Sequence, residues 1–93
     1  MTTGDCIGTI STLNPNAILT IQPAGSDEWI IHNIYTSSTI DFKKVGPNTI
    51  IIATNLADCM SAYFFHASNT QYYQIVNKTA NTIIVGYDGI QSK

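Results

Sequence analysis

Hydrophobic and polar residues alternate along most of the chain with a period of two, and the repeating residues are those that strands favour. Clusters of Pro, Gly and Asn interrupt the alternation, and these residues preset or accept the backbone angles of turns. The pattern predicts strands at 6–13, 17–22, 28–37, 39–45, 49–54, 60–67, 71–77 and 81–87.

The spacing of the predicted strands indicates the class of fold. Short strands every 8–12 residues or so, with turn signals between them, are typical of a β-sandwich or barrel. No segment has the period of an amphipathic helix, which excludes βαβ units, and only segment 55–59 suits a helical turn. We therefore expect one all-β domain over residues 1–93, a small jelly-roll-like β-sandwich of about eight short antiparallel strands.

Three segments lead to specific predictions about burial. Segment 28–37 is predicted to be a central strand covered on both sides, with Trp29 and Tyr35 on the same face. Segment 49–54 is apolar throughout and is predicted to be buried on both faces. The pair Asp88-Gly89 is typical of a turn, so the last strand is predicted to stop before it.

The composition favours contact with another protein over contact with nucleic acid. Charged residues make up 11% of the chain, against about 25% in an average domain, and neutral polar residues replace them. Such a surface loses its water at a low free-energy cost, which suits packing against a partner. The net charge is −2 and the chain has no arginine, so it lacks the basic footprint that nucleic-acid binding requires.

Membrane contact and secretion are not expected. No apolar segment approaches the length of a bilayer span, and residues 1–5 lack the basic and apolar regions of a secretory signal. We therefore expect a protein made in a cytoplasm and free of membranes. In that compartment, Cys6 and Cys59 are predicted to be buried free thiols.

Candidate catalytic groups are few. His32 and His66 lie on different predicted strands, and no His-x-His or Cys-x-x-Cys spacing supports a metal site. Cys59 with His66 is the only conceivable thiol–base pair, and the chain has no glycine-rich phosphate loop. We expect no enzymatic activity, no metal and no cofactor.

The aromatic residues form runs that place rings on both faces of two predicted strands. One face must be the core, while the other is a subunit interface, a sugar-stacking platform, or the second side of a thin sandwich. Association into a homotrimer would cover exposed rings. The candidate interface or stacking residues are Tyr63, Phe65, Tyr72, Tyr73 and Tyr87.

Segment 25–35, Gly-Ser-Asp-Glu-Trp-Ile-Ile-His-Asn-Ile-Tyr, resembles a stretch of small virion proteins of tailed bacteriophages. Segment 86–91, Gly-Tyr-Asp-Gly-Ile-Gln, is similar to the end of such proteins. The resemblance implies a head decoration (cement) protein, or a related head or tail subunit, that sits as a trimer on the capsid lattice. It further implies a location in the virion, the major capsid protein or another virion protein as partner, Trp29 as a core anchor, and Asn33 and Asn77 as ties between strand ends and turns. These are fold-determining positions, so no functional residue is carried over.

Two alternatives remain open at this stage. The first is a carbohydrate- or receptor-binding module of a tail or fibre tip that uses Tyr63, Tyr72, Tyr73 or Tyr87 as stacking rings. The second is a small cupin-like or barrel enzyme with a metal near His32 and His66.

Overall fold

The computed structural model describes residues 3–61 and 63–93, and this part of the chain is all-β, without a helix. Segment 55–59, the one segment that suited a helical turn, does not form one. The predicted fold class, a small sandwich of antiparallel strands, is confirmed. The strands of the described residues are β1 (Cys6–Leu13), β2 (Ile18–Ile21), β3 (Trp29–Thr36), β4 (Ile40–Val45), β5 (Thr49–Leu56), β6 (Phe65–Ala67), β7 (Tyr72–Asn77) and β8 (Ile83–Gln91).

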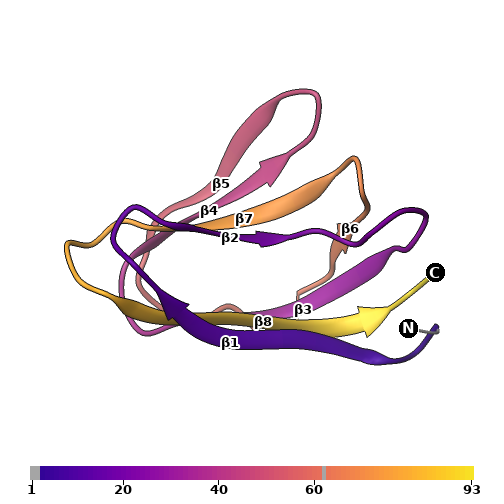
Figure 1. Ribbon diagram of the computed structural model, residues 1–93, viewed down its shortest axis with the longest axis horizontal. Coiled ribbons are helices and arrows are strands. Elements are labelled where there is room, and N and C mark those ends of the chain that lie inside the picture. Colours follow the sequence, from indigo (N-terminus) through magenta and orange to yellow (C-terminus); the bar gives the residue numbers. More distant parts are fainter. Residues whose placement is uncertain (1–2, 62) are drawn as a thin grey trace.

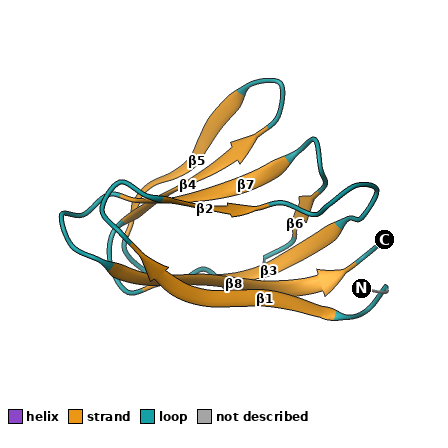
Figure 2. Ribbon diagram, viewed as in Figure 1, coloured by secondary structure: helices purple, strands orange, loops and turns teal. Residues whose placement is uncertain are grey.

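The strands form two four-stranded antiparallel sheets that lie face to face (Figures 1 and 2). One sheet, called sheet A below, has the order β1-β8-β3-β6, and the other, sheet B, has the order β2-β7-β4-β5. Consecutive strands lie in different sheets except for β4 and β5, which form a hairpin. This strand order is that of an eight-stranded jelly roll.

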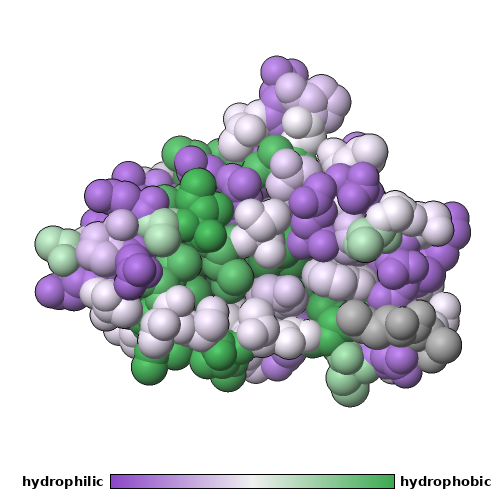
Figure 3. All heavy atoms as spheres, in the orientation of Figure 1, coloured by the Kyte–Doolittle hydropathy of each residue, from purple (hydrophilic) through white to green (hydrophobic). Residues whose placement is uncertain are grey.

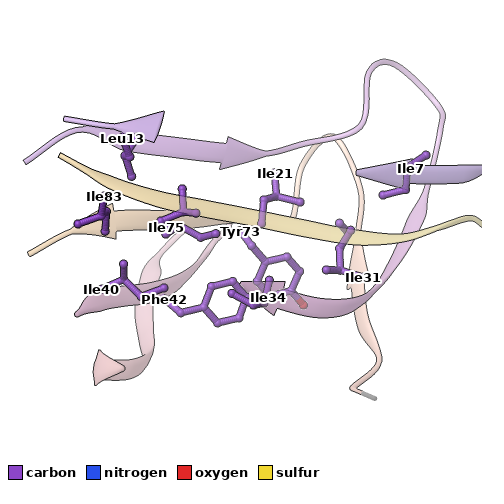
Figure 4. Packing of buried hydrophobic residues seen from close by; sticks show 12 residues of the cluster. Ile7, Leu13, Ile21, Ile31, Ile34, Ile40, Phe42, Tyr73, Ile75 and Ile83 are labelled. Atoms are coloured by element: carbon purple, nitrogen blue, oxygen red, sulfur yellow. The ribbon is translucent and has the colours of Figure 1, made fainter. Parts of the chain in front are cut away.

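The core fills the space between the two sheets. Ile31 and Ile34 of β3, Phe42 of β4 and Ile75 of β7 are fully buried. The ring of Phe42 stacks on that of Tyr73, with 5.4 Å between the ring centroids. Figure 4 shows side chains of both sheets pointing into this shared interior. Most of its aliphatic members are β-branched isoleucines, which pack well on pleated strands.

A β-bulge in β3 changes which residues face the core. The pairing of β3 with β8 shifts between Ile31 and Asn33, which adds one residue to β3. Ile31 and Ile34 are both buried, although strict alternation would place them on opposite faces. The prediction that Trp29 and Tyr35 share a face is therefore wrong. Trp29 packs against the core, whereas Tyr35 lies on the outer face of sheet A.

Strand β8 extends through the Asp-Gly pair that the sequence suggested as a turn. Asp88 pairs with Gly8 of β1 and with Asn33 of β3, so both sides of the strand are occupied at this point. A Cβ atom at Gly89 would overlap the carbonyl oxygen of Ile30, which explains the glycine by the close approach of β3. Pairing on both sides overrides the local turn preference.

Strand β5 is the outer strand of sheet B and is not buried as predicted. The exposed fractions of Ile50, Ile51 and Ile52 are 65%, 47% and 42%. Within the described residues β5 pairs with β4 and with no other strand, and Figure 1 shows the β4–β5 hairpin standing out from the rest of the fold. The prediction that segment 49–54 is buried on both faces is wrong because none of the described residues forms a second layer over these isoleucines.

The predicted strand 60–67 is much shorter in the structure. Met60 forms an isolated bridge with Ile34, and regular pairing begins only at β6. Residue 62, inside the predicted strand, lies outside the described residues. So do residues 1–2, which belong to the segment considered above for a secretory signal.

Asn77 joins several turns at one end of the sandwich. This side chain is fully buried, and its Nδ2 donates to the carbonyl oxygens of Leu13 at 2.9 Å and Asn81 at 2.8 Å. Its Oδ1 accepts the backbone N–H of Thr79 at 2.8 Å. The ends of β1 and β7 and the turn before β8 are thereby tied together, in the role that the resemblance implies for Asn77.

The two ends of the described chain meet at the other end of the sandwich. The backbone N–H of Gly4 donates to the carbonyl oxygen of Gln91 at 2.7 Å, and Figure 1 places both termini on the same side. Next to them the indole N–H of Trp29 donates to Oε1 of Gln91 at 2.8 Å. Trp29 thus packs against the core and also fastens the last strand.

Candidate functional site

Three of the five aromatic residues predicted to form an interface or stacking surface lie wholly or partly inside the sandwich. Tyr73 is 4% exposed and stacks on Phe42, so the prediction is wrong for this ring. Phe65 is partly buried, with its ring centroid 5.1 Å from that of Phe42. Tyr87 is also partly buried, and its ring stacks on Trp29 at 6.3 Å. These rings fill the interior because both layers of a thin sandwich need bulky side chains.

The other rings lie at the surface, close to the start of β6 and β7. Tyr63 is 48% exposed and stacks on Phe65 at 5.4 Å, while Tyr72 is partly exposed at the first position of β7. Phe64 is 71% exposed and meets the edge of the His32 ring at 5.1 Å. Phe64 was not among the predicted candidates, although it stands in the same aromatic run.

The outer edge of sheet B carries three consecutive exposed isoleucines. We call Ile50, Ile51 and Ile52 the β5 edge. Two of the other edge strands, β2 and β6, are short, with 4 and 3 residues. Short edge strands are one way in which proteins prevent unwanted pairing. β5 has 8 residues and no charged side chain, so it lacks that protection.

The outer face of sheet A carries a second group of exposed apolar side chains. Ile10 of β1 pairs with Gly86 of β8, so both point outwards with Ile84, two residues before Gly86. Ile10 and Ile84 are 66% and 52% exposed. Figure 3 views the sandwich from the edge at which β1 and β2 lie in front, and apolar side chains are gathered left of centre on that side as well.

A hollow of about 400 Å³ opens next to these isoleucines. Its lining includes Gly8 and Ile10 of β1, Tyr35 of β3 and Asp88 of β8. Gly86 lies between Ile10 and Tyr35 in the register of the sheet, where it leaves the surface without a side chain. A Cβ atom at Gly8 or Gly86 would collide with the backbone of the adjacent strand, so this bare floor is required by the packing of β1 on β8.

The carboxylate of Asp88 is held in place by two neighbours from β3. Nδ2 of Asn33 donates to Oδ1 at 2.6 Å, and the Tyr35 hydroxyl donates to Oδ2 at 2.7 Å. The hydrogen bond to Asp88 raises the pKa of Tyr35 above its usual value, and burial and the carboxylate charge raise it further. The hollow therefore presents a fixed negative charge beside an aromatic ring.

No protein-family model and no curated protein matches the chain.

Sequence reasoning did not identify Tyr35 and Asp88 as site residues. They are separated by 53 positions, and nothing in the sequence shows that β3 and β8 are neighbours. The bulge at Asn33 also reverses the face that alternation assigns to Tyr35. A usable signal was the pair of glycines, Gly8 and Gly86, within otherwise regular strand patterns, which often marks a close backbone approach.

The histidines and cysteines are dispersed over the surface. His66 is exposed on β6 opposite Ile30, and His32 lies on β3 against Phe64. Within residues 3–61 and 63–93 no group of three or more His, Cys, Asp and Glu side chains is arranged to hold a metal ion. Cys6 and Cys59 are free, as predicted, but both are exposed, so the prediction of burial is wrong.

The described part of the chain contains no helix that is long and apolar enough to cross a membrane.

Proposed function

We propose that this chain is a structural subunit that acts by assembly and not by catalysis. Specifically, we propose a head decoration (cement) subunit of a tailed bacteriophage, which binds and stabilises the assembled capsid as a homotrimer. The observation that carries the proposal is the β5 edge, where three consecutive isoleucines are each more than 40% exposed on an outer strand.

An edge of this kind has two unmet requirements. Contact of its isoleucine side chains with water is unfavourable, by roughly 25 cal/mol for each Å² of exposed apolar surface. Its outer backbone groups have no strand partner in the described residues. A second chain that packs on or pairs with β5 meets both requirements at once. The exposed Ile10 and Ile84 of sheet A add a further apolar contact area.

Three other features support the virion role. Segment 25–35 resembles small virion proteins, and within it Trp29 fastens β3 to the core and to β8. The low fraction of charged residues, 11%, suits a subunit that is surrounded by other proteins. Many copies on a lattice add modest contact energies, so no single contact has to be strong.

The first test is the solution mass of the protein, by size-exclusion chromatography with light scattering at several concentrations. We expect a trimer that the substitution Ile51→Glu converts to a monomer, because a charge at the β5 edge cannot be buried without a partner. Lys43 lies opposite Ile51 in the register and can pair with the glutamate in the monomer, whereas burial of that ion pair under another chain costs the desolvation of both charges. The control is Ile18→Glu, at a 50% exposed position on β2, the opposite edge strand of sheet B. A wild-type protein that remains a monomer at high concentration would contradict self-association through this edge.

The second test concerns the virion itself. Mass spectrometry of purified particles of the encoding phage should find the chain in a fixed ratio to the major capsid protein. Loss of the chain should lower the temperature at which the particles release their DNA. Particles that lack the chain altogether would overturn the decoration role and leave only the assembly role.

The exposed rings of Tyr63 and Phe64 favour a second candidate, a carbohydrate- or receptor-binding module of a tail or fibre tip. This role predicts glycan binding that Tyr63→Ala abolishes while the protein stays folded. The control is Ile18→Ala, at a 50% exposed position on β2 outside the aromatic runs. A glycan array without a signal above background would remove this candidate.

A further inference from the structure

The hollow on the outer face of sheet A presents hydrogen-bond acceptors to anything that enters it. Both oxygens of the Asp88 carboxylate already accept one hydrogen bond each, from Asn33 and Tyr35. A carboxylate has about four acceptor positions, so it retains capacity for a ligand. The Tyr35 hydroxyl donates its one O–H to Asp88 in a hydrogen bond, which leaves the lone pairs of its oxygen available as acceptors. A complementary ligand must therefore donate hydrogen bonds.

Charge narrows the choice of ligand. Among the residues that line the hollow, all of which lie in the described part of the chain, only Asp88 carries a charge at neutral pH. No lysine lies in the lining to neutralise it. A positively charged donor forms hydrogen bonds to a carboxylate that are roughly twice as strong as those of a neutral hydroxyl. The carboxylate thus favours a cation over a neutral sugar.

The residues that line the hollow favour one kind of cation over others. Ile10 offers aliphatic surface, and Tyr35 offers an aromatic ring next to the carboxylate. A guanidinium group is flat, less strongly hydrated than an ammonium group, stacks on aromatic rings and binds a carboxylate through two parallel hydrogen bonds. Gly8 also lines the hollow and adds no side chain to it. These properties match the side chain of arginine.

This chain cannot supply that arginine, because it contains none and all 4 of its basic residues are lysines. We propose that the hollow between Ile10, Tyr35 and Asp88 binds an arginine side chain presented by a different protein. The inference rests on the proposed function in one respect, namely that the partner is a protein. It adds that this partner is not another copy of the chain and that it docks on sheet A, away from the β5 edge.

The site can be tested with small probes before the partner is known. Backbone amide signals of the ¹⁵N-labelled protein are followed by NMR during titration with N-acetyl-arginine methylamide. We expect saturable shifts centred on Gly8, Gly86 and Asp88. N-acetyl-citrulline methylamide has the same shape without the charge and should bind roughly tenfold more weakly, as should methyl glucoside as a neutral sugar.

Two variants test the site residues. Asp88→Asn removes the charge but keeps the size of the side chain, and we expect it to weaken arginine binding roughly tenfold. Ile10→Lys places a competing positive charge at the rim, on a side chain that is 66% exposed, and should weaken binding without disturbing the fold. The second variant keeps the test decisive if Asn33 and Tyr35 do not tolerate the first. The control is Ile18→Lys, which is 50% exposed on β2 and does not line the hollow.

Several results would overturn the inference. These are equal binding of the arginine and citrulline probes, shifts that map elsewhere, and no shifts at the highest soluble probe concentration. A lysine probe that binds as tightly as the arginine probe would also overturn it, since a second copy of the chain could then provide the contact. Oligomer formation is measured separately with Ile51→Glu. Failure at the hollow with an intact trimer therefore leaves the proposed function standing.

Discussion

Two isoleucine-rich segments of this chain look alike in the sequence and differ completely in the structure. In β3, Ile31 and Ile34 are fully buried, whereas in β5 Ile50 and Ile51 are 65% and 47% exposed. β3 lies between β8 and β6, with sheet B over its inner face, while β5 is the last strand of its sheet. The hydrophobicity of a side chain indicates only that its burial is favourable. The position of its strand in the sheet decides whether the burying contacts come from the same chain or from another one.

Irregular pairing acts in opposite ways in the two strands. In β3 the bulge after Ile31 turns Ile34 towards the interior, so that both side chains enter the core. In β5 the pairing with β4 shifts on either side of Phe42, and Ile52 has no residue opposite it in β4. The hairpin bends away from the body of the sandwich instead of closing over it (Figure 1). The bulge in β3 therefore adds a side chain to the core, whereas the irregular pairing of β5 accompanies a hairpin that lies away from the core.

The most direct test of this difference between β3 and β5 is to truncate one isoleucine in each strand. Ile34→Ala should lower the free energy of unfolding by about 2–5 kcal/mol, because it removes buried methyl groups and leaves a cavity. Ile51→Ala should change it by less than about 0.5 kcal/mol, because its side chain is largely in water. Urea unfolding at a protein concentration low enough to keep the chain monomeric measures both. Similar losses for the two variants would show that β5 is covered within a single chain.

A second substitution tests what holds β5 to the sandwich. Asp41 of β4 is 5% exposed, and its Oδ1 accepts the backbone N–H of Asn55 at 3.0 Å, while Lys78 lies 3.7 Å from its Oδ2. Asp41→Ala should cost about 1–3 kcal/mol, the usual penalty for leaving a buried hydrogen-bond partner unsatisfied.

The same variant should speed amide hydrogen exchange in β5 more than in β3. Asp41→Asn retains an acceptor for Asn55 and is the matched control, with a smaller loss expected. Equal acceleration of exchange in both strands would mean that the hairpin does not open separately from the rest of the fold.

The smallest expected effect concerns pH and the two tyrosines of the interior. Burial raises the pKa of Tyr73 and of Tyr87, which lies opposite Ile34, above the usual value of about 10. The folded protein then binds more protons than the unfolded chain in this range, so stability falls as pH rises above about 10. Below that pH these groups contribute no pH dependence.

Urea midpoints measured between pH 8 and pH 11 should show this decline. In Tyr73→Phe the urea midpoint should fall less steeply with pH. Phe42, on which Tyr73 stacks, is retained in that variant, so the aromatic contact survives. An unchanged slope in Tyr73→Phe would assign the alkaline loss of stability to other groups.

Local patterns were sufficient to predict most strands but not their arrangement. The bounds of β1 were predicted correctly because its alternation ends at a turn of Asn14-Pro15-Asn16, in which Asn16 has the positive φ of 62° that asparagine tolerates. The extension of β8 through Asp88 was missed because it depends on partners from β1 and β3. Strand order, bulges and edges are set by contacts between residues distant in sequence, and the amino-acid sequence alone does not reveal these contacts.

The candidate site depends almost entirely on those distant contacts. Tyr73 was expected at the surface because it stands beside another tyrosine, yet its position in β7 turns it towards Phe42. Tyr35 and Asp88 meet only through the pairing of β3 with β8. The free state of Cys6 and Cys59 was predicted from the expected compartment, but their exposure follows from the places of their segments in the fold.

The two ends of the described chain lie next to each other, which allows the strands to be connected in a different order along the polypeptide. Because Gly4 and Gln91 are joined by a backbone hydrogen bond, a short linker could close the polypeptide into a ring without moving any strand. The ring could then be reopened at the turn between β1 and β2, around Asn16, which is exposed. Such a permuted chain would carry its free ends at the end of the sandwich where Asn77 ties the turns, and the eight-stranded order would be independent of where synthesis begins.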